Sequence, residues 1–513
     1  MKHLGVGLLC SLAVLTAAAQ TSPTLVATNV VPNGRKMSLQ DCIASTLRHN
    51  LDVQIQRYNP EIALYNLRAS YGGYDPLLSL SGAHDVNVQP GGFFDGIPLP
   101  NETIKDDTFS SGLSGELPFT GLQYDFTGNI YQQHFLQFPT NGAAFLSRDS
   151  AGSIGVQLTQ PLLKNAWIDS TRLTILVNKN RLKYNEQGFR EQLITSVTAV
   201  ENAYYELIFA LENLKVQQEA LDLSQTQLEQ DQQRAQIGTL TQLSVQQDQS
   251  QAAQNQANVI TAQSTLETDE NTLKNLITDN YPALHDTDIQ PTETLTAPLV
   301  LFDLQDSWSR GMSQRPDLLQ YRLNVKNAGI QLKFYRNQLF PELDVIGTYG
   351  WNGAGVAPYG VYNDTFAEIR EGNAPYYSYG AQLSTPLGNL NARNQFKSGK
   401  ATLQQVVLQL KQFEQNVLVE IDNAVKTAQS DYESVSATRQ ARIYAEAALD
   451  AEQKTYAFGK ATTFEVLTYQ NNLTVARGQE IRALANYEEA LANLYAQEGS
   501  TLERLGINIQ ATP

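Results

Sequence analysis

Residues 197–214 read VTAVENAYYELIFALENL, and their apolar side chains recur at alternating spacings of three and four residues. The recurring positions are Val197, Val200, Tyr204, Leu207, Leu211 and Leu214. Such a stripe lies on one face of an α-helix and forms the seam of a coiled coil. No proline occurs from 162 to 237, so we expect one helix of about 70 residues, which at 1.5 Å per residue reaches roughly 105 Å. A helix of this length is too long for a compact domain.

The chain repeats this organisation in its second half. At a constant offset of 221 residues the first copy matches the second through paired positions, among them Gly238 and Gly459, and Thr241 and Thr462. Fixed-offset matches are the signature of an internal repeat. We expect a first repeat at 37–281, a linker at 282–301 and a second repeat at 302–499, followed by a C-terminal tail at 500–513. The first repeat carries a long insertion at 83–154, which we expect to lie in surface loops.

Each copy predicts the same order of elements. A helical stretch at 37–74 or 302–340 precedes a strand region, and a long helix and a shorter return helix follow it. The long helices, the second of which spans about 387–458, end at the lone glycines Gly238 and Gly459. Glycine suits the left-handed turn of a helical hairpin. We expect two short helices, stacked end to end, to line each long one.

Prolines bound the strand regions, and we expect strand–helix junctions at Pro76, Pro161, Pro341 and Pro386. Segments such as DPLLSLSGAHDVNV (75–88) alternate apolar and polar residues, and tyrosines gather between 349 and 379. This pattern is typical of transmembrane β-strands, although an ordinary half-buried sheet explains each single segment equally well. Four strands cannot close a barrel, which needs about eight, so the chain must share a barrel with its copies. The hairpin-like segment 109–131 either adds strands or decorates the outside.

The first residues indicate export. Lys2 precedes an apolar run that ends in three alanines, which is typical of a signal peptide at 1–19 with the mature chain starting near Gln20 and an extension at 20–36. Cys10 lies within the apolar run and follows a leucine, which argues against lipid attachment there. After the signal no run of about 20 apolar residues occurs, so a membrane-crossing chain would have to cross as a β-barrel.

Composition excludes several classes of function. Cys42 is the only cysteine after the signal, so no intramolecular disulfide is possible. The formal charge is -16, and removing Lys2 with the signal leaves -17, which argues against nucleic acid as a partner. No nucleophile, phosphate-loop or metal motif occurs, and the histidines are scattered. We therefore expect no enzyme activity, no cofactor and no metal site. The scattered histidines are His49, His84, His134 and His285.

Three stretches resemble the TolC-like outer membrane efflux proteins: RPDLLQYRLNVKNAGIQLKFYRNQLFPELDVIGTYG (315–350), PLGNLNAR (386–393) and FGKATTFEVL (458–467). The resemblance implies an α+β membrane protein that combines a long α-helical coiled-coil barrel with a β-barrel shared between protomers, four strands per chain and twelve per homotrimer. It also implies contact with outer-membrane lipid and a location in the outer membrane that extends into the periplasm. The function it implies is a passive gated duct for efflux or secretion, which works with a periplasmic adaptor protein and an inner-membrane transporter.

The same resemblance implies a set of site residues. Tyr456 and Glu465 match positions that close the periplasmic end of such ducts, with Lys460 as the nearest cation. Ala461 and Thr468 stand where the family has an arginine and an aspartate, so a closure here would be weaker or differently wired. A solvated helix carboxylate is the alternative interpretation of Glu465. The hairpin turns, which the resemblance implies contact the adaptor, contain Gly238, Thr241, Gly459 and Thr462.

A secreted or surface-anchored coiled-coil adhesin is the alternative function. It would also show heptads and a signal peptide. It does not explain why strands interrupt each copy of the repeat.

Overall fold

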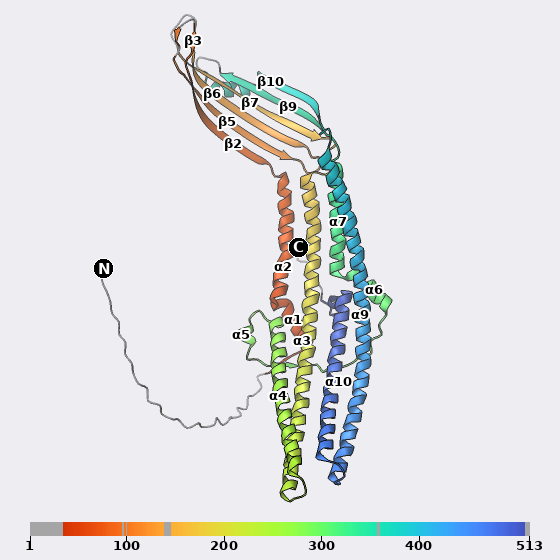
Figure 1. Cartoon of the computed structure of the whole chain (residues 1–513). Coiled ribbons are helices and arrows are strands. Elements are labelled where there is room, and N and C mark those ends of the chain that lie inside the picture. The colour runs from red at the N-terminus through yellow and green to blue at the C-terminus, as the bar shows by residue number, and fades with distance from the viewer. Residues whose placement is uncertain (1–33, 95–96, 99, 138–144, 356–359, 508–513) are drawn as a thin grey trace, which may run out of the picture.

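The computed structural model describes residues 34–94, 97–98, 100–137, 145–355 and 360–507. These residues form an elongated rod of helices with a sheet at one end (Figure 1). The predicted signal peptide, Cys10 and most of the predicted N-terminal extension lie outside the described residues. The end of the extension, β1 (Arg35–Met37), pairs in parallel with β8 (Ile289–Pro291) beside the middle of the rod.

Two long helices run the length of the rod, as the apolar seam predicts. They are α3 (Ser170–Gln236, 67 residues) and α9 (Leu390–Ala457, 68 residues), each about 100 Å long at 1.5 Å per residue. The side chain of Asp169 starts α3 by accepting a hydrogen bond from the amide of Arg172 at 2.8 Å. Each helix follows a strand of the sheet after a short link: α3 follows β7, which ends at Pro161, and α9 follows β10, which ends at Ser384.

Shorter helices pack end to end along the long ones. Along α3 lie α1 (Leu39–His49), α2 (Leu51–Ser70) and the return helix α4 (Gln242–Ile277). Along α9 lie α6 (Leu304–Gln314), α7 (Pro316–Asn337) and the return helix α10 (Thr463–Glu498). The predicted stretches 37–74 and 302–340 are each divided in two. Asn50 ends α1 in an extended conformation, and its side chain caps α2; Arg315 is likewise extended between α6 and α7 but makes no capping hydrogen bond with its side chain.

Four single-turn or short helices complete the helical elements of the described residues. They are η1 (Tyr71–Tyr74), α5 (Tyr281–Leu284), α8 (Tyr362–Glu371) and α11 (Thr501–Arg504). No helix among the described residues is long and apolar enough to cross a membrane.

The main core lies where α1, α3 and α4 meet β1 and β8. It is built on the predicted seam: Val197, Val200, Tyr204 and Leu207 are fully buried. The hydroxyl of Tyr204 donates to the carbonyl of Met37 at 3.1 Å, which fastens β1 to α3. At the same level Glu201 is fully buried and pairs with Arg504, so α11 is also held against α3.

The sheet has six strands, so the prediction of four strands per chain is wrong. Its order is β10-β9-β7-β6-β5-β2, and every neighbouring pair is antiparallel. The insertion supplies the two extra strands, β5 and β6, which lie between β2 and β7 rather than outside the sheet. The small β3 (Phe93–Phe94) and β4 (Ile97–Pro98) pair with each other. The sheet strands are β2 (Leu77–Gln89), β5 (Glu102–Glu116), β6 (Gln123–Gln137), β7 (Phe145–Pro161), β9 (Glu342–Gly355) and β10 (Pro375–Ser384).

The strand register gives the sheet one apolar and one polar face. Residues paired across neighbouring strands share a face, and successive residues of a strand alternate between faces. One cross-strand row therefore contains only apolar and aromatic side chains: Leu78, Leu113, Phe126, Val156, Tyr349 and Tyr377. A row on the opposite face contains Ser81, Ser110, Asn129, Ser153 and Asn352. At the level of these two rows, the alternation read from single strands is thus in register across the neighbouring strands.

Candidate functional site

The hairpin tips at the end of the rod far from the sheet hold most of the predicted site residues. Gly238 (φ +79°) and Gly459 (φ +71°) adopt the left-handed conformation that ends α3 and α9. No atom lies within 4 Å of where a Cβ would stand at either glycine, so both turns are exposed. The conformation, and not crowding, is what requires glycine here.

The threonines after the glycines start the return helices. Thr241 caps α4, because its hydroxyl oxygen accepts a hydrogen bond from the amide of Ser244 at 3.3 Å. Thr462 caps α10 in the same way, accepting a hydrogen bond from the amide of Glu465 at 3.3 Å. Glu465 completes a capping box, because its carboxylate accepts hydrogen bonds from the amide of Thr462 at 2.7 Å and from its hydroxyl at 2.9 Å. These bonds lower the pKa of Glu465. The carboxylate therefore has a local structural role, whether or not it also faces a pore.

Tyr456 ties the two hairpins together through a residue that sequence reasoning missed. Its hydroxyl donates to Oδ2 of the fully buried Asp231 at 2.6 Å and lies 3.1 Å from the hydroxyl of Thr463. Asp231 also accepts a hydrogen bond from Gln227 at 2.8 Å. The guanidinium of Arg234 lies 3.4 Å from Asp231 and 5.0 Å from the centre of the Tyr456 ring. One buried carboxylate on α3 thus binds α9 directly, and α10 reaches it through Thr463.

A second buried acid, Asp248 on α4, lies beside Asp231. Neither carboxylate oxygen of Asp248 has a hydrogen-bond partner among the described residues. Burial and the neighbouring charge of Asp231 raise the pKa of Asp248 to about 7. Two ionised carboxylates cannot share such a site without strong repulsion, so one proton is held between them at low pH.

Lys460 and the four predicted junction prolines lie outside the group formed by Tyr456, Thr463, Asp231 and Asp248. Lys460 is exposed beyond the α9 turn. Pro76 directly precedes β2, Pro161 ends β7, Pro341 directly precedes β9, and Pro386 follows the end of β10 by two residues.

The histidines and acids form no metal-binding group. Among the described residues no three His, Cys, Asp or Glu side chains could hold a metal ion. His84 pairs with Asp107 at 2.6 Å on the sheet, whereas His49 lies 3.3 Å from Asp279 beside α1. His134 lies on β6, and His285 follows α5.

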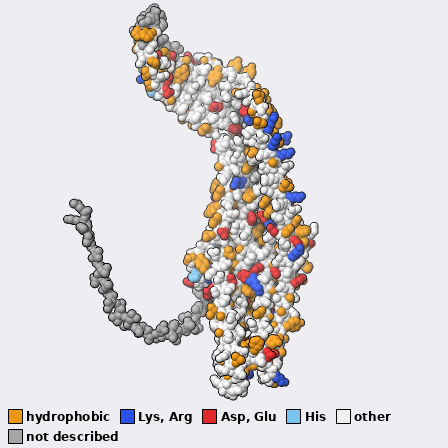
Figure 2. All heavy atoms as spheres, in the orientation of Figure 1, with side chains coloured by type: hydrophobic (Ala, Val, Ile, Leu, Met, Phe, Trp, Pro, Cys, Tyr) orange, Lys and Arg blue, Asp and Glu red, His pale blue; other side chains and the backbone are white. Residues whose placement is uncertain are grey.

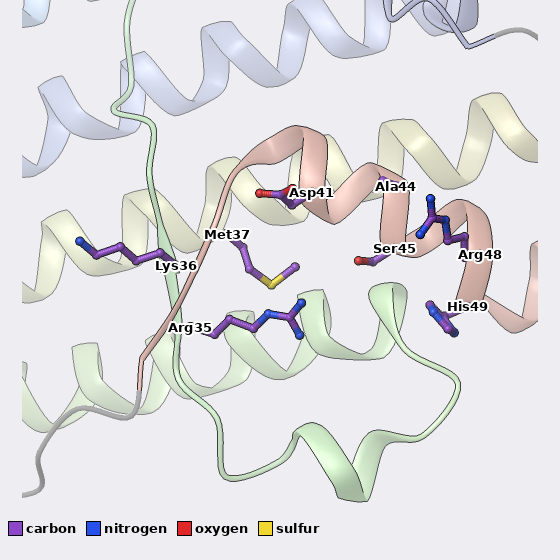
Figure 3. Close-up of a pocket in the computed structure, with 8 residues that line it drawn as sticks. All are labelled: Arg35, Lys36, Met37, Asp41, Ala44, Ser45, Arg48 and His49. Carbon is purple, nitrogen blue, oxygen red and sulfur yellow. The ribbon is translucent and has the colours of Figure 1, made fainter.

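A shallow cleft of about 430 Å³ opens beside α1, midway along the rod. Figure 3 shows Arg35, Arg48 and His49 along it, with Asp41 at the N-terminal end of α1. Asp41 is already engaged, because its carboxylate accepts the amide of Ser38 at 3.1 Å in a capping box. The cleft is therefore a basic surface feature, separate from the residues around Asp231 and Tyr456 at the hairpin tips.

The two neighbouring acids, Asp231 and Asp248, predict that the stability of the hairpin tips depends on pH. The folded pKa of Asp248, about 7, lies above its ordinary value of 3.8. Ionisation therefore destabilises the packing of the hairpin tips: the penalty is absent below about pH 4, grows as pH rises towards 7, and is fully present above it, on the order of a few kcal/mol. Amide hydrogen exchange at the tips of α3 and α4, corrected for intrinsic rates, should show protection falling from pH 5 to pH 8.

Asp248→Asn should remove this pH dependence, because the amide cannot ionise. Glu229→Gln, at an exposed position of the neighbouring helix α3, is the matched control and should keep the parent's pH dependence. An Asp248→Asn protein whose protection still falls with pH as steeply as the parent's would exclude the acid pair as the cause.

Known proteins resemble this chain both in sequence and in fold. Residues 134–278 and 309–500 match the family described as outer membrane efflux protein. The chain is 23% identical over 393 residues to outer membrane protein TolC of Escherichia coli (strain K12), covering 76% of each chain. Two solved structures share its fold: the CmeC outer membrane channel of Campylobacter jejuni (TM-score 0.65, 13% identity, 90% of this chain and 86% of that one) and outer membrane protein VceC of Vibrio cholerae (TM-score 0.63, 17% identity, 90% and 96%). With most of its length matched, the chain belongs to the outer membrane efflux protein family.

Proposed function

We propose that three copies of the chain form a passive, gated exit duct. The chain is an outer-membrane efflux protein that extends into the periplasm, in keeping with its family. The observation that carries the proposal is the sheet, whose apolar and polar faces continue across all six strands. In a membrane-spanning β-structure the apolar face contacts lipid and the polar face lines water. The rod of helices then continues the water-filled passage into the periplasm.

Closure of the barrel requires further copies of the chain. Within the described residues, the outer edges of β2 and β10 pair with no other strand. β2 leads away from the helices and β10 leads back to them, so β10 of one copy can join β2 of the next in antiparallel pairing. Three copies of six strands give an eighteen-stranded barrel instead of the twelve that the resemblance implies. Barrels of 16–18 strands are wide enough to leave an aqueous channel.

Charge next to the sheet supports this placement in the membrane. Figure 2 shows Lys and Arg side chains along the edge of the upper helices, just below the sheet. The first turns of α9 contribute the exposed Arg393, Lys397 and Lys400. Basic side chains at this level can reach lipid phosphates while the apolar face of the sheet stays in the hydrocarbon layer.

The hairpin tips are the gate and docking site of this proposal. The Tyr456–Asp231 hydrogen bond holds the two hairpins together, so opening the passage requires breaking it. Lys460 and Glu465 lie at the same end, where three copies would repeat each charge around one axis. The exposed turns at Gly238 and Gly459 offer a surface for the tip of a periplasmic adaptor, which would connect the duct to an energised inner-membrane transporter.

The alternative of a coiled-coil adhesin has no support from the family match. The heptad seam that suggested it belongs to α3, which packs against α1, α2 and α4 and follows β7 of the sheet after a short link.

Neighbouring residues on β6 test the assignment of the two faces. In a Cys42→Ala background, which removes the buried free thiol, Thr127→Cys places a thiol on the polar face and Phe126→Cys places one on the apolar face. A charged, water-soluble thiol reagent should modify Thr127→Cys in lipid vesicles and lower single-channel conductance. It should leave Phe126→Cys unmodified, because lipid covers that thiol. Equal modification of both variants would show that the sheet does not divide water from lipid.

Paired substitutions at the turns test the docking role. Gly459→Val should impair export in cells, because a β-branched residue resists φ > 0 at a cost of about 1–2 kcal/mol. Gly459→Asn, which tolerates this conformation, should retain export, and Gly238 should behave alike. The readout is complementation of the export defect of a strain that lacks the gene, at matched outer-membrane abundance. If valine and asparagine variants complement equally, the turn conformation is not needed for docking.

A further inference from the structure

The short helix α8 lies against the sheet rather than extending away from it. It connects the outward ends of β9 and β10 and packs on β9, β7 and β6. The buried hydroxyl of Thr365 lies 2.6 Å from the hydroxyl of Ser150 on β7. The hydroxyl of Tyr362 donates to the carbonyl of Asp107 on β5 at 3.3 Å. The helix is thus fastened across several strands.

The register places α8 on the apolar face. Ser150 pairs with Gln132 on one side and Gly355 on the other, and residues two positions along these strands belong to the same face. That next row contains Ile130, Gly152 and Gly353. A Cβ at Gly353 would lie 2.4 Å from the carbonyl oxygen of Thr365, so glycine is needed for α8 to approach the strand this closely.

A groove of about 560 Å³ lies between α8 and this face. Leu80, Ile154, Phe366 and Ile369 form its walls, and Ser111 and Gly128 lie in a row between Leu80 and Ile154. Because Ser111 and Gly128 are small, the groove is deeper at this point than it would be with larger side chains. The volume falls in the range of about 300–1,000 Å³ that is typical of small-molecule sites.

The helix itself is amphipathic. Phe366 and Ile369 line the groove, whereas Asp364, Glu368 and Arg370 are exposed to solvent. An amphipathic helix of this kind lies at the boundary between the hydrocarbon layer and the head groups, with its apolar side chains inward. α8 therefore covers the groove from the outward side, where the membrane meets water.

We propose that this groove binds one acyl chain of a lipid of the surrounding membrane. The proposal rests on the proposed function, which puts the apolar face of the sheet in the bilayer. The groove is apolar, and it is continuous with the face that lipid covers. A second copy of the chain is a poor occupant, because copies meet at the β2 and β10 edges, whereas most of the groove lies over β5, β6 and β7 beneath α8, and only Leu80, Ser81 and Gly82 come from β2.

Filling the groove tests the proposal. Full-length protein, reconstituted in vesicles of dimyristoylphosphatidylglycerol and released into detergent, should retain about one lipid per chain when the intact assembly is weighed by mass spectrometry. Ser111→Phe places a ring in the groove and should weaken retention about tenfold. Leu78→Phe, on the same face but outside the groove, is the matched control and should retain lipid like the parent.

Each outcome decides one question. Loss of lipid in Ser111→Phe alone, with normal pore conductance in all three proteins, supports the groove. Equal retention in the three proteins, or no retained lipid in a parent that forms pores, overturns it and leaves the proposed duct standing. A parent protein that forms no pores contradicts the proposed function itself.

Discussion

The unpaired edges of the sheet constrain everything else in this molecule. Among the residues that the structure describes, no further strand pairs with the outer edge of β2 or of β10, so each edge presents a row of main-chain N–H and C=O groups to its surroundings. Each such group costs several kcal/mol if it is left unsatisfied in hydrocarbon. A six-stranded open sheet with a largely apolar face and two free edges is therefore stable in neither water nor lipid by itself. In the proposed assembly, further copies of the chain pair with the edges, and lipid covers the apolar face.

The helices follow from this constraint. α3 and α9 each follow a strand of the sheet after a short link and extend about 100 Å, so the arrangement of the strands fixes where the distant tips of each copy lie. At those tips the two hairpins are joined through one buried carboxylate, Asp231, rather than through a large apolar core. A contact of this kind is strong only while its charges are balanced, which suits the gate that we propose, since a gate has to open. The acid pair with Asp248 makes that balance sensitive to protons.

Sequence patterns predicted the parts of the structure that repeat regularly. The spacing of Val197, Val200, Tyr204 and Leu207 indicated the long helix and its buried face, and alternation indicated four of the strands. The extra strands β5 and β6 were left open because they lie in an insertion, and the resemblance to the family favoured four. The alternation of 123–130, where Tyr124, Phe126 and Ile130 share one side of the strand, was the signal that could have identified β6.

The site was harder to predict, because its decisive contacts join distant elements. Asp231 and Asp248 look like ordinary solvated helix residues, and only the packing of α3 against α4, α9 and α10 buries them. Tyr456 was identified through the family resemblance without its partner. The sequence did contain a signal for the capping role of Glu465, since a threonine three residues before a glutamate is typical of a capping box. The resemblance to the family suggested a pore-facing carboxylate instead.

The central claim, that copies of the chain complete the sheet, is tested most directly by single-particle imaging of the full-length protein in lipid nanodiscs. The account predicts a threefold assembly with one closed barrel of eighteen strands, six from each chain, above a single helical tube. A monomer with an open six-stranded sheet, or a barrel closed within one chain, would contradict it.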